Sequence, residues 1–216
     1  MAKIVAICSG GLDSTILYYD LISHGNEVYP INFNYGSKHN NIERSKAIKL
    51  IPDIKLIDID LSFLKSSSLI SKEVEVPHGH YQAENMKSTV VPFRNGIMLS
   101  YAVAYAEELG AKIVMFGAHS GDHHIYPDCR IDFIDNFSES ASVGTYNNIE
   151  VQAPYSNFDK GYIVFIGKKL NIEHIMKDTW SCYEGKDIHC GECGSCTERK
   201  EAFKLAGVID QTMYAK

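Results

Sequence analysis

The sequence lacks both of the familiar glycine-rich phosphate loops. The Walker pattern G-x-x-x-x-G-K-[ST] occurs nowhere in its 216 residues, and neither does the dinucleotide pattern G-x-G-x-x-G. An excess of positive charge is also missing, since the formal charge is −6 at pH 7, which argues against a general nucleic-acid binder. No apolar run is long enough to span a membrane, and no signal peptide is recognisable. We therefore expect a cytoplasmic protein without membrane attachment or stable nucleic-acid binding.

What is present is ordinary globular composition. Hydrophobic residues make up 45% of the chain and charged residues 22%, which excludes intrinsic disorder. The length is sufficient for one domain with a sizeable core. We expect a main domain over residues 1–178, with a small segment over residues 179–216 packed on it.

The stretch Ser9–Ser14, with the letters SGGLDS, is the strongest local signal. It follows the apolar run Lys3–Cys8 and precedes a helical pattern, so a buried strand, a Gly-Gly turn and a helix N-terminus are predicted in that order. Backbone N–H groups and the positive end of a helix bind anions at such a turn. Gly10 and Gly11 also permit close backbone approach. We predict a phosphate-binding loop; the alternative is a helix-starting turn that happens to contain two glycines.

Strand and helix patterns alternate along most of the chain. This alternation predicts an α/β fold with a doubly wound, Rossmann-like parallel sheet. The helix expected over Arg94–Leu109 carries Ile97, Tyr101 and Tyr105 at helical spacing. Regularity fails from Ser62 to Phe93, and a loop of that length in a compact domain is usually functional or mobile. The five strands are expected at Lys3–Cys8, Glu27–Phe33, Ile54–Leu61, Lys112–Ala118 and Ile149–Ala153.

Several polar residues should share one crevice with the stretch Ser9–Ser14, here called the diglycine loop, because ligands of such sheets bind beyond the carboxyl ends of the strands. Arg94 and Asn95 begin a helix, where a guanidinium could hold a phosphate or carboxylate with two hydrogen bonds. Asp122 could hold Mg²⁺ against ATP phosphates, and Lys160 could meet a departing pyrophosphate. A turn role for Asp122 and a solvated Lys160 are the alternatives. The histidines of the His119–His124 loop lack metal-ligand spacing and are interpreted as loop residues.

Four of the six cysteines lie close together near the C-terminal end. Cys190, Cys193 and Cys196 form a C-x-x-C-x-x-C run, and Cys182 lies eight residues upstream of it. In a cytosolic protein such spacing indicates metal ligation before disulfides. Four thiolates suit a structural zinc ion with no open coordination position. An iron–sulfur cluster and unligated redox thiols remain alternatives.

Together these motifs resemble the 7-cyano-7-deazaguanine synthase family of the PP-loop pyrophosphatase superfamily. The matching stretches are SGGLDS at 9–14, FNYG at 33–36, TVVPFRN at 89–95, YPDCR at 126–130, TWSCY at 179–183 and CGECGSC at 190–196. The resemblance implies an adenine nucleotide alpha hydrolase-like fold, a structural Zn²⁺ ion and a homodimer. It also implies an ATP-dependent ligase. ATP would adenylate 7-carboxy-7-deazaguanine, ammonia would displace AMP to give the amide, and a second adenylation would lead to the nitrile.

The resemblance also assigns roles to individual residues. Catalysis would involve Asp13, Ser14, Arg94 and Asp122, with Mg²⁺ on the phosphates. ATP would be bound by Ser9, Gly10, Gly11, Asp13, Ser14, Thr15, Phe33, Tyr35 and Lys160. The deazaguanine would be contacted by Asn95, Tyr126, Asp128 and Arg130, and the zinc by Cys182, Cys190, Cys193 and Cys196.

The sequence departs from the family pattern at three places expected to surround the pocket. Phe93 stands where the family has the glycine of P-G-R-N, and Ser37 and Lys38 replace the Q-R of Y-G-Q-R-H. The His119–His124 loop is also atypical. These departures leave open an enzyme that stops at 7-amido-7-deazaguanine. Another PP-loop amidating or RNA-modifying enzyme and a non-catalytic ATP-binding zinc module are the further alternatives.

Overall fold

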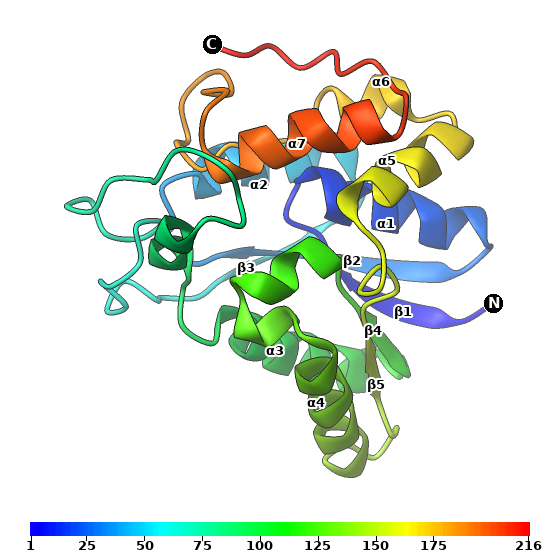
Figure 1. The fold of residues 1–216 in the computed structure, drawn as a ribbon. Helices are drawn as coiled ribbons and strands as arrows, with labels where there is room; N and C mark the ends of the chain where they lie inside the picture. Colours follow the sequence, from blue (N-terminus) through cyan, green and yellow to red (C-terminus); the bar gives the residue numbers. More distant parts are fainter.

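A five-stranded, wholly parallel sheet forms the centre of the protein (Figure 1). The computed structural model describes all 216 residues. The strands are β1 (Lys3–Ile7), β2 (Glu27–Asn34), β3 (Lys55–Asp58), β4 (Ile113–Met115) and β5 (Glu150–Gln152), in the order β3-β2-β1-β4-β5. The winding reverses at β1, which pairs with both β2 and β4. In such sheets the reversal opens a crevice beyond the carboxyl ends of the central strands. The predicted doubly wound sheet is confirmed.

Helices cover both faces of this sheet (Figure 1). One layer contains α1 (Leu12–Ser23), α2 (Asn40–Leu50), α5 (Lys160–Lys169), α6 (Glu173–Met176) and α7 (Gly194–Leu205). The other layer contains α3 (Arg94–Leu109) and α4 (Ile131–Val143). No helix combines the length and the apolar character that crossing a bilayer would require.

The central strand shows why the sequence folds in this way. Val5 packs into the core under α3, whereas its neighbours Ile4 and Ala6 pack into the core under α1. Successive side chains of a strand point to opposite faces, so an uninterrupted apolar run produces a strand buried on both sides. The diglycine loop that follows β1 is thereby fixed to a central strand that is buried on both faces.

Two helix predictions need correction. On α3 the buried side chains are those of Met98, Leu99, Ala102, Val103 and Ala106, whereas Tyr101 is 47% exposed. The small alanines set the distance of this helix from the sheet, and the tyrosines therefore lie at its margin. Helix α4 was not predicted, because its sequence is rich in Asp, Ser and Asn, which are poor helix formers. Burial of Ile134 and Ala141 against the β5 side of the core overrides that weakness.

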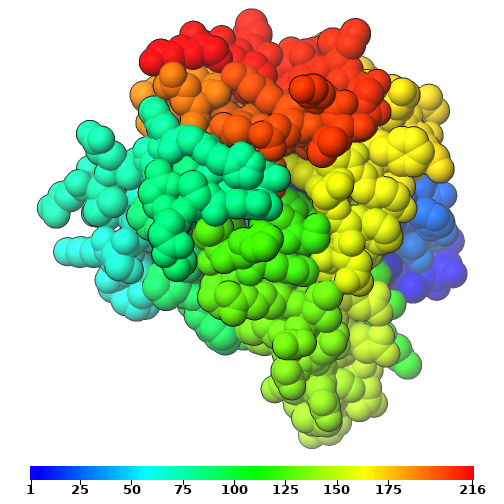
Figure 2. All heavy atoms as spheres, in the orientation of Figure 1, coloured from blue at the N-terminus to red at the C-terminus, as the bar shows by residue number.

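The long loop of residues 62–93 contains one 3₁₀ helix, Glu84–Thr89, and lies against the C-terminal segment (Figures 1 and 2). The Gly79 N–H donates a hydrogen bond to the Glu192 carbonyl at 3.0 Å, and Lys38 Nζ donates to the Val74 carbonyl at 2.6 Å. The loop is thus fastened at two points.

Arg199 ties the C-terminal segment together. It is fully buried, and its guanidinium donates hydrogen bonds to the Met176 carbonyl at 2.7 Å and to the Thr179 hydroxyl at 2.8 Å. It also faces the Asp210 carboxylate at 3.7 Å. One cation therefore joins the end of α6, helix α7 and the final residues of the chain.

Replacing Arg199 by leucine should lower the free energy of unfolding by about 3 kcal/mol, because the buried acceptors and Asp210 lose their partner. Urea unfolding of Arg199→Leu measures this change, with Lys204→Ala on the exposed face of α7 as the matched control. A loss below about 1 kcal/mol would contradict the central role of this arginine.

Candidate active site

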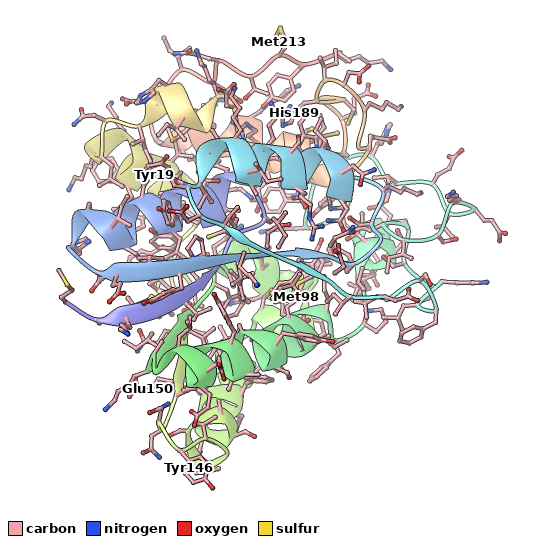
Figure 3. All side chains as sticks on the ribbon, turned by 180° about the vertical axis from the view of Figure 1, so that it is seen from behind. Tyr19, Met98, Tyr146, Glu150, His189 and Met213 are labelled. Atoms are coloured by element: carbon pink, nitrogen blue, oxygen red, sulfur yellow. The ribbon has the colours of Figure 1, made fainter.

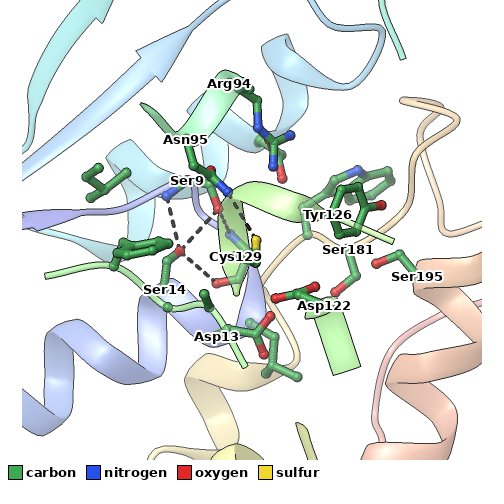
Figure 4. A pocket seen from close by; sticks show the side chains of 18 of the residues that line it. Ser9, Asp13, Ser14, Arg94, Asn95, Asp122, Tyr126, Cys129, Ser181 and Ser195 are labelled. Carbon is green, nitrogen blue, oxygen red and sulfur yellow. Dashed lines mark hydrogen bonds between the residues drawn. The ribbon is translucent and has the colours of Figure 1, made fainter. Parts of the chain in front are cut away.

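A cavity of about 220 Å³ lies beyond the carboxyl ends of the central strands (Figure 4). Its walls come from the diglycine loop, the end of β2, the starts of α2 and α3, the segment after β4, and the C-terminal segment. Of the residues predicted for the site, those that line it are Ser9, Gly11, Asp13, Ser14, Phe33, Tyr35, Arg94, Asn95, Asp122, Tyr126 and Lys160.

Hydrogen bonds within the diglycine loop hold it open as a cradle. The Ser9 N–H donates to Ser14 Oγ at 3.1 Å, and the Gly11 N–H donates to Ser9 Oγ at 3.1 Å (Figure 4). The two hydroxyl oxygens are themselves 3.1 Å apart. Together with the N-terminus of α1, this arrangement presents polar hydrogens to an anion.

Gly10 shapes the cradle from behind and does not line the cavity. Its φ of +93° suits glycine, and a Cβ here would collide with the backbone carbonyl of Glu43. Its own carbonyl accepts a hydrogen bond from the Trp180 N–H at 2.9 Å. Thr15 also lies behind the loop, fully buried, and its hydroxyl has no partner. Both residues therefore support the cradle rather than face its contents.

Lys160 lies between two carboxylates on the floor of the cavity. Its Nζ is 2.9 Å from Asp13 Oδ2 and 2.9 Å from Glu198 Oε2. Burial alone would lower the pKa of this amine, but the two carboxylates raise it above its usual value. Lys160 is therefore charged and firmly positioned, and Glu198 brings helix α7 into contact with the diglycine loop.

Arg94 supplies a second cation on the opposite wall. Its guanidinium donates to the Tyr35 hydroxyl at 3.0 Å and lies 5.5 Å from the centre of that ring. Arg94 lies at the N-terminus of α3, where the helix dipole disfavours a cation, and no carboxylate forms an ion pair with it to offset this effect. An anionic ligand would supply the missing counter-charge.

The structure separates the predicted substrate residues into two groups. Asn95 and Tyr126 line the cavity, and the Tyr126 hydroxyl lies 2.9 Å from that of Thr89. Asp128 lies behind it and accepts a hydrogen bond from the Asn95 N–H at 2.8 Å, which caps the start of α3. Arg130 is exposed, and its Nε donates to the His123 carbonyl at 3.2 Å. Neither Asp128 nor Arg130 is brought to the cavity.

Phe93, Ser37 and Lys38, which depart from the family pattern, were predicted to surround the pocket. All three lie outside this cavity. Phe93 adopts a left-handed conformation at φ +55°, and its ring packs edge-on against Phe133. Lys38 is occupied in fastening the long loop. In the atypical His119–His124 loop, Asp122 alone lines the cavity.

Fourteen residues that the sequence analysis did not select complete the lining. They are Ile7, Leu12, His39, Glu43, Met98, Phe116, Gly117, Ala118, Cys129, Trp180, Ser181, Tyr183, Ser195 and Glu198. Trp180, Ser181 and Tyr183 belong to the TWSCY motif, which had been considered only for its cysteine. Nothing in the local sequence distinguishes Glu198 from a solvated helix residue.

His39 and Glu43 form a largely uncharged pair at the rim of the cradle. His39 Nε2 and Glu43 Oε2 are 3.6 Å apart, and both side chains are largely buried. Burial raises the pKa of Glu43 to about 8, and burial together with nearby Arg94 lowers the pKa of His39 to about 4. At neutral pH most Glu43 side chains therefore retain their proton.

The four predicted cysteines form one cluster. The sulfurs of Cys182, Cys190, Cys193 and Cys196 all lie within 4.8 Å of one another. Backbone N–H groups of Glu184 and Cys190 point at Cys182 Sγ, at 3.4 and 3.3 Å. Such donors stabilise thiolates, so the cluster suits a metal ion with four sulfur ligands.

Comparison with known proteins gives consistent matches. The family model described as "Queuosine biosynthesis protein QueC" matches residues 3–207. The 7-cyano-7-deazaguanine synthase of Desulfotalea psychrophila is 44% identical over 99% of both chains. The 7-cyano-7-deazaguanine synthase 2 of Colwellia psychrerythraea is 43% identical over the whole of both chains.

Two solved structures share the fold at low sequence identity. A predicted subunit of tRNA methyltransferase from Methanocaldococcus jannaschii has a TM-score of 0.50 at 16% identity, over 78% of this chain and 75% of that one. A 4-thiouridine synthetase in complex with RNA and ATP has a TM-score of 0.50 at 19% identity, over 95% of this chain and 50% of that one. At these identities the likeness concerns the fold alone.

Cys190→Ser should remove the metal ion from the purified protein and lower its melting temperature, because a hydroxyl replaces one of four thiolate ligands. Elemental analysis of metal per chain measures the loss. Cys129→Ala, which lies outside the cluster, is the control and should retain a full equivalent. Full metal content in Cys190→Ser would disprove the four-sulfur site.

Glu43→Gln should make the melting temperature of the protein fall less as the pH becomes alkaline. Because burial raises the pKa of Glu43 from 4.5 to about 8, its contribution to stability is present below pH 4.5 and is lost as the pH rises through 8. The variant should match wild type at pH 5 and melt at least about 2 °C higher at pH 9. Exposed Glu75→Gln is the control; equal curves for wild type and Glu43→Gln would show that Glu43 ionises normally.

Proposed function

Because the chain belongs to the QueC family of queuosine biosynthesis proteins, we propose that it is an ATP-dependent ligase that converts 7-carboxy-7-deazaguanine and ammonia into 7-cyano-7-deazaguanine. One observation supports this reaction most directly. The diglycine cradle and the unpaired guanidinium of Arg94 face each other across a single cavity. An anion cradle and a separate cation suit a reaction that joins a triphosphate to a carboxylate.

ATP would lie with its β- and γ-phosphates in the cradle. The hydroxyls of Ser9 and Ser14, held in place by the N–H groups of Ser9 and Gly11, would stabilise negative charge on the leaving pyrophosphate together with the N-terminus of α1. The adenine would rest near Phe33 and Tyr35 at the end of β2. This placement directs the α-phosphorus towards the middle of the cavity.

Mg²⁺ is the proposed partner of the phosphates. Asp13, Asp122 and Glu198 surround Lys160, so the floor carries more negative than positive charge and would repel a bare triphosphate. A divalent cation would remove this repulsion. Asp13 Oδ1 is buried without a hydrogen-bond partner, which supports Asp13 as the ligand.

Arg94 would orient the acid substrate. A carboxylate oxygen of the substrate attacks the α-phosphorus of ATP, and pyrophosphate leaves into the cradle. Ammonia then bonds to the acyl carbon, and AMP leaves to give the amide. A second adenylation on the amide oxygen, followed by loss of AMP and of both amide protons, gives the nitrile. The departures at Phe93, Ser37 and Lys38 lie outside the cavity, which favours completion of this second stage.

The remaining assignments are supporting ones. Asn95 and Tyr126 would contact the deazaguanine, and Asp128 would position Asn95. Arg130 has no role in this proposal because it does not line the cavity. Zn²⁺ is the proposed metal of the cysteine cluster, and four thiolates would leave it no open position for catalysis. The proposed assembly is a homodimer.

The purified protein, given 7-carboxy-7-deazaguanine, an ammonium salt and excess ATP with Mg²⁺, should release AMP and pyrophosphate and accumulate the nitrile, which mass spectrometry detects. Asp13→Asn should reduce AMP formation at least about 100-fold. Asp135→Asn on the exposed side of α4 is the control. The amide as sole end product would establish the amide-stopping alternative, and no AMP with any acceptor would favour a non-catalytic module.

A further inference from the structure

A second, much smaller cavity adjoins the first. Its volume is about 20 Å³, which is room for about one water-sized molecule. Asp122, Tyr126, Tyr183 and Glu198 line both cavities, so the small one borders directly on the proposed reaction site. The other lining residues of the small cavity are Tyr81, Met86, Gly121, Ile125 and Gly194.

A third cavity, of about 190 Å³, adjoins the small one. It is bounded by the start of α5, by the 3₁₀ helix Ser120–His124, by residues 81–82 of the long loop and by α7. It shares Tyr81, Gly121 and Glu198 with the small cavity. The outer cavity also shares Lys160 and Glu198 with the main cavity, so the three cavities are contiguous, and Glu198 is the one residue that lines all of them.

Carboxylates line all three cavities, but only the main cavity also contains the guanidinium of Arg94 and the diglycine cradle. The outer cavity carries the carboxylates of Asp159, Glu198 and Glu201, and the small cavity those of Asp122 and Glu198. Lys160, the one lysine that lines these cavities, is already paired with two carboxylates. Such a lining attracts cations and repels phosphates and carboxylates, whereas Arg94 and the cradle attract anions.

We propose that the outer cavity and the small cavity are the entrance and binding site for ammonium, separate from the cavity that holds ATP and the acid; this rests on the proposed function. The fit is chemical and steric. Ammonium is a water-sized cation, and the phenol rings of Tyr81, Tyr126 and Tyr183 complete a lining that suits it. Met86 and Ile125, both buried, set the size limit.

Ammonium must lose a proton before its nitrogen can attack. The Asp122 carboxylate, which lines both the small and the main cavity, accepts that proton and frees the nitrogen lone pair. The nitrogen then bonds to the acyl carbon while the bond from that carbon to the AMP oxygen breaks, and AMP keeps the electron pair. A second N–H proton passes to the departing phosphate, which leaves the neutral amide. Water that would hydrolyse the acyl adenylate competes with ammonium for this small cavity.

Charge reversal at the outer cavity tests the entrance. Glu201→Lys should raise the KM for ammonium about threefold or more at low salt, with less effect at high salt, and should leave kcat and the KM for ATP unchanged. Glu150→Lys, on β5 far from this entrance (Figure 3), is the matched control and should change none of them. An unchanged KM for ammonium in Glu201→Lys, or an equal rise in the KM for ATP, would overturn the proposal.

Enlarging the small cavity tests the binding site independently. Wild type should exclude methylamine, whereas Met86→Ala should incorporate it and release the N-methyl amide, identified by mass spectrometry. Exclusion of methylamine by a folded Met86→Ala protein that still uses ammonium would also contradict the site. AMP formation by wild type is scored separately: its absence would refute the proposed ligase, whereas its presence with no ammonium-specific effect would refute the ammonium site alone.

Discussion

Lys160 and its two carboxylates are the interaction on which the site depends. Asp13 comes from the first turn of α1, Lys160 from the start of α5 and Glu198 from α7, and they meet within ion-pair distance in a largely buried place. A buried ion pair needs good geometry to offset the loss of hydration, so these three segments have few alternative arrangements. The electrostatics of the cavity floor follow from this contact, including its need for a further cation when a triphosphate binds.

The cysteine cluster is linked to the cavity floor through the same contact. Cys196 and Glu198 are two residues apart at the start of α7, so a metal that fixes the one also fixes the other. The long loop adds a further restraint, since Gly79 is hydrogen-bonded beside the cluster at Glu192. A structural metal can therefore set the position of a carboxylate in the reaction cavity without touching any substrate.

Features that depend on neighbouring residues could be predicted from the sequence. The run Lys3–Cys8 and the two glycines after it indicate a buried strand and a tight turn, and the cysteine spacing indicates the cluster. Features that depend on tertiary packing could not be predicted. Glu43 and Glu198 reach the cavity only because α2 and α7 pack beside the diglycine loop, and Asp128, expected at the substrate, caps α3 instead. Helix α4 forms despite the weak helix propensity of its residues because Ile134 and Ala141 pack into the core.

The Trp180 N–H bond to the Gly10 carbonyl has a consequence for how the enzyme is made. Ser9 and Glu198 lie near opposite ends of the chain, yet both line one cavity. Contacts so distant in sequence form late, after local structure is in place. During synthesis the diglycine loop is made well before Trp180, Ser181 and Glu198, which supply one side of the cavity around it. A nascent or truncated chain therefore has a phosphate cradle without an enclosed reaction chamber around it.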